Sequence, residues 1–181
     1  MRTESQEQYV EFVTSRLPAL RKFAYVLCGD NHNADDLVQQ TITKLYIRWK
    51  RIRDVEHLDQ YVRTMLARLF VDEKRRPWTR VGLVADVPDR ADSRTGVDER
   101  VAQAVVVRNA LAQVPSRQQA VLILRFLCDM PVEDVAAALD CSAGTVKSQT
   151  SRGLATLRRL LGDTGPDIEP LNAARHARRE R

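Results

Sequence analysis

The clearest candidate for a functional site is a set of polar side chains within residues 143–161, a segment that contains no acidic residue. Its members, which we call the acid-free face, are Thr145, Lys147, Ser148, Gln149, Ser151 and Arg152. Side chains of these types and lengths can reach base edges and phosphates in the major groove of DNA. A merely solvated helix face would normally also carry glutamates, so the absence of acids favours a surface that faces phosphates.

Two amphipathic segments must hold this face in place. Val132, Val135 and Leu139 would share one side of a short helix, a tight turn follows at residues 140–142, and a second helix begins with Ser142 as its expected N-cap. The apolar residues expected to be buried on the second helix are Val146, Leu154, Leu157 and Leu161. The small residues that would let the two helices approach closely are Ala136, Ala137 and Ala143. The pattern predicts a helix-turn-helix.

The N-terminal part of the chain predicts a long amphipathic helix. Apolar residues three and four positions apart run from Val10 to Leu27 and form one continuous stripe. Pro18 interrupts this stripe, so we expect a kink or break near Arg16. Gly29 then ends the segment.

Two more helices are predicted before residue 76. For the first of them we expect Asn33 to be the N-cap, which would place Asp35 and Asp36 in the first turn, where the helix dipole favours carboxylates. The other carries an apolar stripe over residues 58–70 and ends in a charged run at residues 72–76. With the long N-terminal helix they would make one compact unit.

The organisation of the whole chain is therefore predicted to be all-α, with two small helical domains. We expect a first domain at residues 1–76, a flexible linker at 77–98 that is rich in turn residues, a second domain at 99–161 and a disordered tail at 162–181. Within the second domain, a serine and a glutamine at the ends of residues 116–119 form a capping-box pattern.

Composition excludes several classes of protein. The chain of 181 residues has a net charge of +5, which favours a polyanionic partner. No apolar run is long enough for a membrane span or a signal peptide, so a cytoplasmic protein is expected. Three cysteines without a CxxC pair indicate neither a disulfide framework nor a metal site. Without a glycine-rich phosphate loop or a nucleophile motif, we expect no enzyme and no cofactor.

Three stretches resemble the small two-domain bacterial sigma factors of the extracytoplasmic-function group (group IV), and within it the actinobacterial sigma-E-like subfamily. ADDLVQQTITKLY at 34–46 resembles the helix of that family that docks on RNA polymerase. LAQVPSRQQAVLILRF at 111–126 and GTVKSQTSRGLATLR at 144–158 resemble its promoter-reading domain. The resemblance covers about residues 6–161, in the same order on both sides of the linker.

The resemblance implies a role for each group of residues. Four residues would bind polymerase core at the clamp helices of its largest subunit: Asp35, Asp36, Val38 and Gln39. Six would engage minus-10 promoter DNA: Tyr61, Arg63, Arg68, Lys74, Arg75 and Arg76. The acid-free face would read the minus-35 element. An anti-sigma protein is a further implied partner.

The chain departs from the family pattern at several positions. Tyr61 stands where relatives usually have tryptophan, Gln40 where an acid is common and Leu69 where asparagine is frequent. The loop at residues 50–60 is more charged than usual, so we assign no base contact to it. The alternative interpretation of Tyr61 is an aromatic residue of the hydrophobic core.

An alternative function is a helix-turn-helix repressor or activator that binds operators without polymerase. The first 76 residues would then be a sensor or dimerisation module. Such a protein has no reason to carry ADDLVQ beside a helix that ends in EKRRPW, so the sequence favours the sigma factor.

Overall fold

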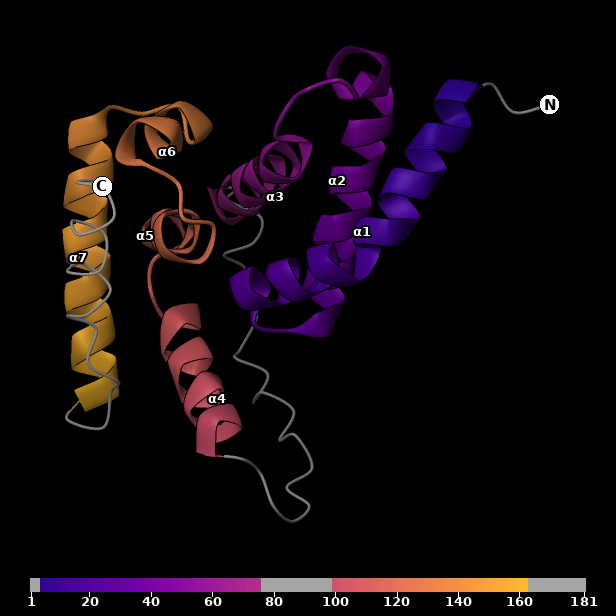
Figure 1. Ribbon diagram of the computed structural model, residues 1–181. Coiled ribbons are helices and arrows are strands. Elements are labelled where there is room, and N and C mark those ends of the chain that lie inside the picture. The colour runs from indigo at the N-terminus through magenta and orange to yellow at the C-terminus, as the bar shows by residue number, and fades with distance from the viewer. Residues whose placement is uncertain (1–3, 76–98, 163–181) are drawn as a thin grey trace, which may run out of the picture.

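The computed structural model describes residues 4–75 and 99–162, and every element within these ranges is helical (Figure 1). The elements are α1 (Glu4–Cys28), α2 (Asn31–Ile52), α3 (Leu58–Arg75), α4 (Glu99–Ala112), α5 (Ser116–Leu122), the π-helical turn η2 (Ile123–Leu127), α6 (Val132–Ala138) and α7 (Ala143–Leu161). We call α1–α3 the first unit and α4–α7 the second unit. The predicted all-α class is confirmed, whereas the predicted linker and nearly all of the predicted tail lie outside the described residues.

Helix α1 continues through Pro18 and is assigned as one helix. Its ribbon bends along its length in Figure 1, so the expected disturbance is a bend rather than a break. Gly29 ends the helix in the left-handed region, with a φ of 80°, where glycine meets no steric penalty.

The N-cap of α2 is Asp30, and the prediction of Asn33 was wrong. The carboxylate of Asp30 accepts a hydrogen bond from the Asn33 backbone N–H at 2.8 Å, and its second oxygen accepts one from the Asn33 side chain at 2.7 Å. The helix thus begins three residues earlier than expected. No acid lies in its first turn, so Asp35 and Asp36 are one turn further in and gain less from the helix dipole.

The second unit contains the predicted helix-turn-helix in α6 and α7. Ser142 is the N-cap of α7, as expected, and its hydroxyl oxygen accepts the Thr145 backbone N–H at 3.1 Å. In the turn, Asp140 adopts a φ of 49°, a left-handed conformation that aspartate tolerates better than most residues. Val146 and Leu157 of α7 are buried, which leaves the opposite side of the helix free for solvent.

The two units pack against each other. In Figure 1 the helices follow one another across the molecule from α7 through α5 and α6 to α3 and then to α2 and α1. Helix α3 contacts both α5 and α6, and α1 contacts α4. One hydrophobic cluster runs through both units and includes the fully buried side chains of Leu66 and Leu124. Among the described helices none is long and apolar enough to cross a lipid bilayer.

Candidate nucleic-acid interface

The acid-free face lies on α7 with most of its side chains in solvent. Lys147, Ser148, Ser151 and Arg152 are exposed, and the remaining two members are half-buried. The buried residues of α7 face α4, α5 and α6, so packing against the rest of the second unit turns the polar side of the helix outwards. The four exposed side chains of the acid-free face can therefore contact a flat or grooved polyanion without any rearrangement of the fold.

The first turn of α7 fixes the hydroxyl groups of the face. The Ser142 and Thr145 hydroxyl oxygens lie 2.9 Å apart, and the Ser148 hydroxyl donates to the Thr145 carbonyl oxygen at 3.0 Å. Thr145 is therefore part of the cap, beside the N–H groups of the helix N-terminus. That position suits a phosphate contact, because orphan N–H groups and the helix dipole both favour an anion there.

The close approach that positions α7 is made by Gly153, which the sequence analysis did not single out. A Cβ on Gly153 would lie 2.9 Å from Cδ1 of Leu122 and 3.1 Å from its Cγ. Of the alanines expected to serve this purpose, Ala136 is buried and Ala143 is half-buried, but Ala137 is exposed. The contact that needs a small residue is thus between α7 and α5, and the prediction was wrong for Ala137.

On α2, three of the four predicted polymerase contacts are exposed: Asp35, Asp36 and Gln39. The Asp35 carboxylate pairs with the Arg21 guanidinium at 3.0 Å, and the Asp36 carboxylate lies 3.8 Å from Nε2 of His32. All of these side chains are more than half exposed, so water screens the pairs and a partner can replace them.

Val38 differs from its three neighbours because it is 3% exposed and belongs to the hydrophobic core. Its side chain cannot touch a partner in this conformation, which corrects the expectation of a direct contact. Its contribution is to hold α2 in place. Gln40, next to these residues, donates a hydrogen bond to the Glu73 carboxylate at 2.6 Å and ties α2 to α3.

On α3 the predicted residues have different environments. Tyr61 is half-buried and packs against the core, while Lys74 is exposed. The Arg63 guanidinium lies 5.9 Å from the centre of the Phe23 ring. Burial raises the pKa of the Cys128 thiol, and the nearby Arg63 cation opposes this shift. The side chain of Arg75 and the whole of Arg76 lie outside the described residues.

Arg68 is exposed on α3 but already bonded. Its guanidinium donates to the Ala137 carbonyl oxygen at 2.6 Å and to the Ala138 carbonyl oxygen, both at the C-terminal end of α6. A cation at a helix C-terminus satisfies orphan carbonyls and the negative end of the dipole. The Arg68 guanidinium, which was predicted to contact minus-10 DNA, is thus already bound to carbonyl oxygens of the second unit.

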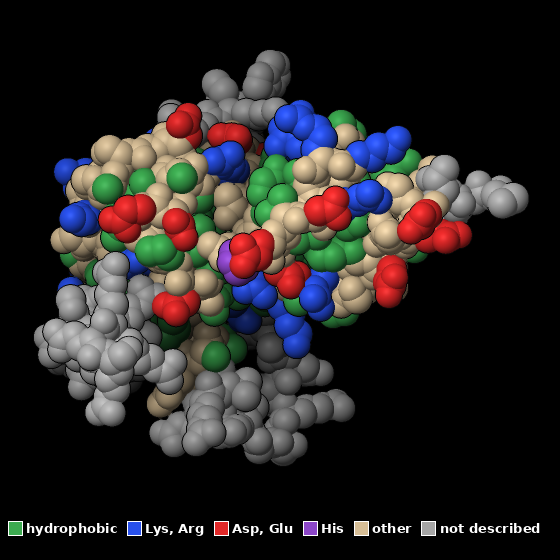
Figure 2. All heavy atoms as spheres, turned by 45° about the horizontal axis from the view of Figure 1, so that its top comes forward, with side chains coloured by type: hydrophobic (Ala, Val, Ile, Leu, Met, Phe, Trp, Pro, Cys, Tyr) green, Lys and Arg blue, Asp and Glu red, His purple; other side chains and the backbone are tan. Residues whose placement is uncertain are grey.

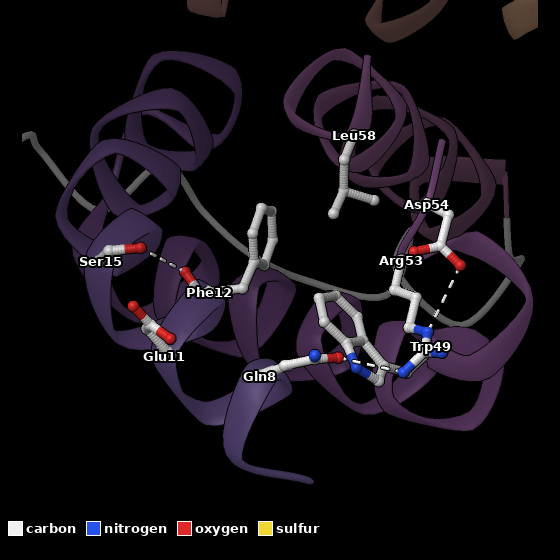
Figure 3. Close-up of a pocket in the computed structure, with 8 residues that line it drawn as sticks. All are labelled: Gln8, Glu11, Phe12, Ser15, Trp49, Arg53, Asp54 and Leu58. Atoms are coloured by element: carbon white, nitrogen blue, oxygen red, sulfur yellow. Dashed lines mark hydrogen bonds and ion pairs between the residues drawn. The ribbon is translucent and has the colours of Figure 1, made fainter. Parts of the chain in front are cut away.

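A surface pocket of about 390 Å³ lies beside the connection between α2 and α3 (Figure 3). Phe12 and Trp49 line one part of it, with ring centres 5.5 Å apart, and Arg53 lines another. The Arg53 guanidinium donates to the Gln8 side-chain oxygen at 3.1 Å. Within the described residues the indole N–H of Trp49 has no hydrogen-bond partner.

Charges of both signs occur together on the face shown in Figure 2, where Asp and Glu side chains are interspersed with Lys and Arg. A general basic patch therefore does not cover this face. The acid-free face of α7 is instead distinguished by its lack of acidic side chains. This feature of α7 indicates DNA binding more strongly than the net charge of +5 does.

Family models match both units. Residues 12–80 match the sigma-70 region 2 model, and residues 104–157 match the sigma-70 region 4 model. A simple helix-turn-helix repressor has no need for the first of these regions, so the comparison favours the sigma factor over that alternative.

Curated relatives and a solved structure agree with these matches. The RNA polymerase sigma-E factor of Streptomyces coelicolor is 33% identical over 157 residues, which cover 85% of this chain and 86% of the relative. The extracytoplasmic-function sigma factor EcfG of Rhodopseudomonas palustris is 30% identical, with coverage of 86% and 88%. The sigma factor RpoE from Bartonella quintana, solved in complex with the anti-sigma factor NepR, has a TM-score of 0.65 at 26% identity over 84% of this chain and 96% of that one. The chain belongs to the extracytoplasmic-function RNA polymerase sigma factors, a non-enzymatic family that binds polymerase core and promoter DNA and directs promoter-specific transcription initiation.

Proposed function

We propose that the two halves of this sigma factor divide promoter recognition between them. Residues 1–76 would form the domain that docks on core polymerase and engages the minus-10 region, residues 77–98 the linker, and residues 99–161 the domain that reads the minus-35 element. The observation that carries the proposal is the exposed acid-free face of α7, held by the Ser142 cap. Its long donors suit guanine edges and phosphates.

Docking on polymerase core would use Asp35, Asp36 and Gln39 against basic residues of the clamp helices in the largest subunit. The proposal is supported by their common exposure on one helix and by the weakness of their present pairs. The Arg21 and His32 partners would be exchanged for partner cations at little cost, since both pairs are open to water.

The minus-10 element would meet α3 and the pocket beside the α2–α3 connection. Lys74 and Arg75 supply positive charge at the C-terminal end of α3, and Arg76 follows them in the sequence. Arg63 and Arg68 lie nearer the N-terminal end of the helix. The half-buried ring of Phe12, which lines the pocket, would suit an unstacked base, because base and ring faces stack regardless of sequence. Trp49 is 5% exposed and its indole N–H is buried, so it would support this ring rather than bind the base.

An anti-sigma protein is the partner that we propose for the free form. The RpoE relative was solved in complex with the anti-sigma factor NepR, which supports an equivalent partner here. Since core polymerase and promoter DNA are its other partners, we expect the protein to act in the cytoplasm.

Footprinting of the assembled holoenzyme tests which half of the protein engages which promoter element. Core polymerase is mixed with the protein and a promoter fragment, and DNase I protection and permanganate reactivity of thymines are mapped together. We expect protection over the minus-35 element and reactive thymines near the minus-10 element. In holoenzyme with Arg152→Ala, protection should weaken upstream only. Loss of both signals with that variant would contradict the assignment of α7 to the upstream element.

A further inference from the structure

The pocket beside the α2–α3 connection has two polar walls of different character (Figure 3). Glu11 and Ser15 of α1 form the first wall, whereas Arg53 and Asp54 form the second. Figure 3 shows the ring of Phe12 between the two walls. The volume of about 390 Å³ lies within the usual range of small-molecule sites. A flat molecule that stacks on Phe12 would therefore meet a carboxylate at one edge and a guanidinium at the other.

Two contacts hold Arg53 in the second wall. Its Nη1 donates to the side-chain oxygen of Gln8 at 3.1 Å, and its Nε lies 3.4 Å from the Asp54 carboxylate. The first of these bonds joins α1 to the residue that caps the C-terminal end of α2. A guanidinium carries five N–H donors in one plane, so these two contacts fix its direction and leave donors for a ligand. Because the side chain is 38% exposed, a molecule in the pocket can reach it.

Guanine is the nucleobase whose two polar edges match these walls. On one edge O6 and N7 both accept, and the planar fork of an arginine donates to this pair of atoms in its commonest specific contact with DNA. On the other edge N1–H and the N2 amino group both donate, which suits the carboxylate of Glu11. Guanine could therefore satisfy both walls while its face stacks on Phe12.

The other three bases fit the two walls less well. Adenine carries an amino group beside N7, so one of its donors would face the donors of Arg53. Cytosine and thymine are narrower and keep their hydrogen-bonding groups along one edge, so they could satisfy only one wall at a time. A donor that faces a donor loses its bond with water and gains none, which rejects the wrong base.

We propose that the pocket selects an unstacked guanine of the melted minus-10 strand, that Arg53 and Glu11 determine this choice, and that Gln8 is a positioning residue for Arg53. The inference rests on the proposed role of the pocket in minus-10 binding. Phe12 would hold any base by stacking, whereas the two charged side chains supply the preference. Since Gln8 and Glu11 belong to α1, base choice would depend on a helix outside the α2–α3 connection.

Binding of base-substituted strands by holoenzyme tests the preference. A fluorescent single-stranded minus-10 oligonucleotide is taken from a promoter that the holoenzyme transcribes, and each position is replaced in turn by each of the four bases. Fluorescence anisotropy gives the affinity of wild-type holoenzyme for every strand. We expect one position at which guanine binds about ten-fold more tightly than any other base, as a good two-point arginine contact predicts.

Modified bases at that position identify the atoms involved. Replacement of guanine by 7-deazaguanine removes N7, and replacement by hypoxanthine removes the N2 amino group. We expect each change to weaken binding to the wild type about three- to five-fold, as loss of one hydrogen bond predicts. In Arg53→Ala, 7-deazaguanine should bind as well as guanine. In Glu11→Ala, hypoxanthine should bind as well as guanine.

The role of Gln8 has its own pair of variants. Gln8→Ala leaves the Arg53 fork without its acceptor, so we expect the preference for guanine over adenine to fall to about three-fold. Gln8→Glu keeps an acceptor at the same place and should retain the full preference. A role in stability alone would alter the affinity for all four bases together and would leave their ratio unchanged.

Matched controls separate base choice from the loss of charge. Arg51→Ala removes an exposed cation from α2, and Glu7→Ala removes an exposed carboxylate from α1. Neither residue lines the pocket. Both variants should shift the affinity for all four strands by the same factor, because a change in net charge acts on the phosphates and not on the base.

Several results would overturn the inference. Two need no substitution in the protein: the absence of any position that prefers guanine, and equal affinity of the wild type for guanine and 7-deazaguanine. Retention of the full preference in Arg53→Ala is a third. A preference for another base that Arg53→Ala abolishes would overturn the choice of guanine but keep an unstacked base in the pocket. Failure of the proposed function looks different, because wild-type holoenzyme would then bind the minus-10 strand no better than a scrambled strand.

Discussion

The side-chain amide of Gln119 donates a hydrogen bond to the carbonyl oxygen of Leu27, 92 residues away in the sequence. The local pattern predicted a capping box in which Ser116 and Gln119 satisfy the start of α5. The structure shows no side-chain cap there, since Pro115 is the N-cap residue and the glutamine turns towards α1. A polar residue at a helix start thus serves tertiary packing, and the interface between the two units depends on it.

Replacement of Arg152 by alanine should weaken binding of the minus-35 duplex. Loss of a good base contact by this exposed guanidinium costs about 1–3 kcal/mol, and discrimination between bases at one position should fall with it. Arg159→Ala, in the last turn of the same helix, is the control and should change binding far less. Unchanged affinity and specificity in Arg152→Ala would remove this residue from the interface.

Removal of the α2 carboxylates should weaken binding to core polymerase. We expect the double substitution Asp35→Ala and Asp36→Ala to cost about 1 kcal/mol per carboxylate, with a smaller loss at high salt because the charges are exposed. Surface plasmon resonance at two ionic strengths measures both effects. Glu133→Ala on α6 is the control for an exposed acid elsewhere.

Arg21→Ala removes the ion pair between α1 and α2 and keeps the Asp35 carboxylate. Since the guanidinium lies 3.0 Å from Asp35 and competes with any cation of a partner, its removal should leave core affinity unchanged or raise it. A loss of affinity as large as that of the double aspartate variant would mean that Arg21 itself contacts polymerase.

Gly153→Val should destabilise the second unit. Even a Cβ would lie 2.9 Å from Leu122, and the added methyl groups overpack the α5–α7 contact by about 1–3 kcal/mol. Gly144→Val is a matched control, because the nearest atom to its Cβ is the Ser142 hydroxyl oxygen at 3.7 Å. Urea unfolding of both variants checks the difference, and equal midpoints would contradict the packing argument.

The thiol of Cys28 should react slowly in the folded protein. Burial, with a smaller contribution from Asp30, raises its pKa to about 12, so almost no thiolate exists at pH 8. We expect alkylation by iodoacetamide at pH 8, followed by mass spectrometry, to be at least about 100-fold slower than in the urea-unfolded chain.

The same shift links Cys28 to stability at high pH. Because the folded pKa lies above the ordinary value of 9.0, the protonated thiol stabilises the fold fully below pH 9 and this contribution is lost as pH rises towards 12. Equal alkylation rates in the folded and unfolded chains would contradict both statements.

Local patterns predicted the elements of this protein well. The apolar periodicity placed α1, α3 and α7, and Ser142 was identified as the cap of α7 because a serine directly before an apolar helix has few other roles. The cap of α2 was missed because Asp30 and Asn33 are both good N-cap residues three positions apart. Only the hydrogen bond from the Asn33 backbone N–H to the Asp30 carboxylate distinguishes them.

Contacts between the units could not be predicted from the sequence. Arg68 reads as a phosphate ligand on a basic helix, and no periodicity indicates that its acceptors are carbonyls of Ala137 and Ala138. Val38 belongs to a motif that resembles a docking helix, and only burial shows that its role there is packing. Resemblance assigns a helix to a partner, whereas the structure decides which side chains of that helix are accessible.

Run-off transcription tests the central claim most directly. Purified bacterial core polymerase is given a pool of promoter fragments from the source genome, with and without this protein. The account predicts transcripts that start at defined promoters only when the protein is added, and that weaken both with the double aspartate variant and with Arg152→Ala. Binding of the same fragments without any transcript would contradict it and favour a repressor.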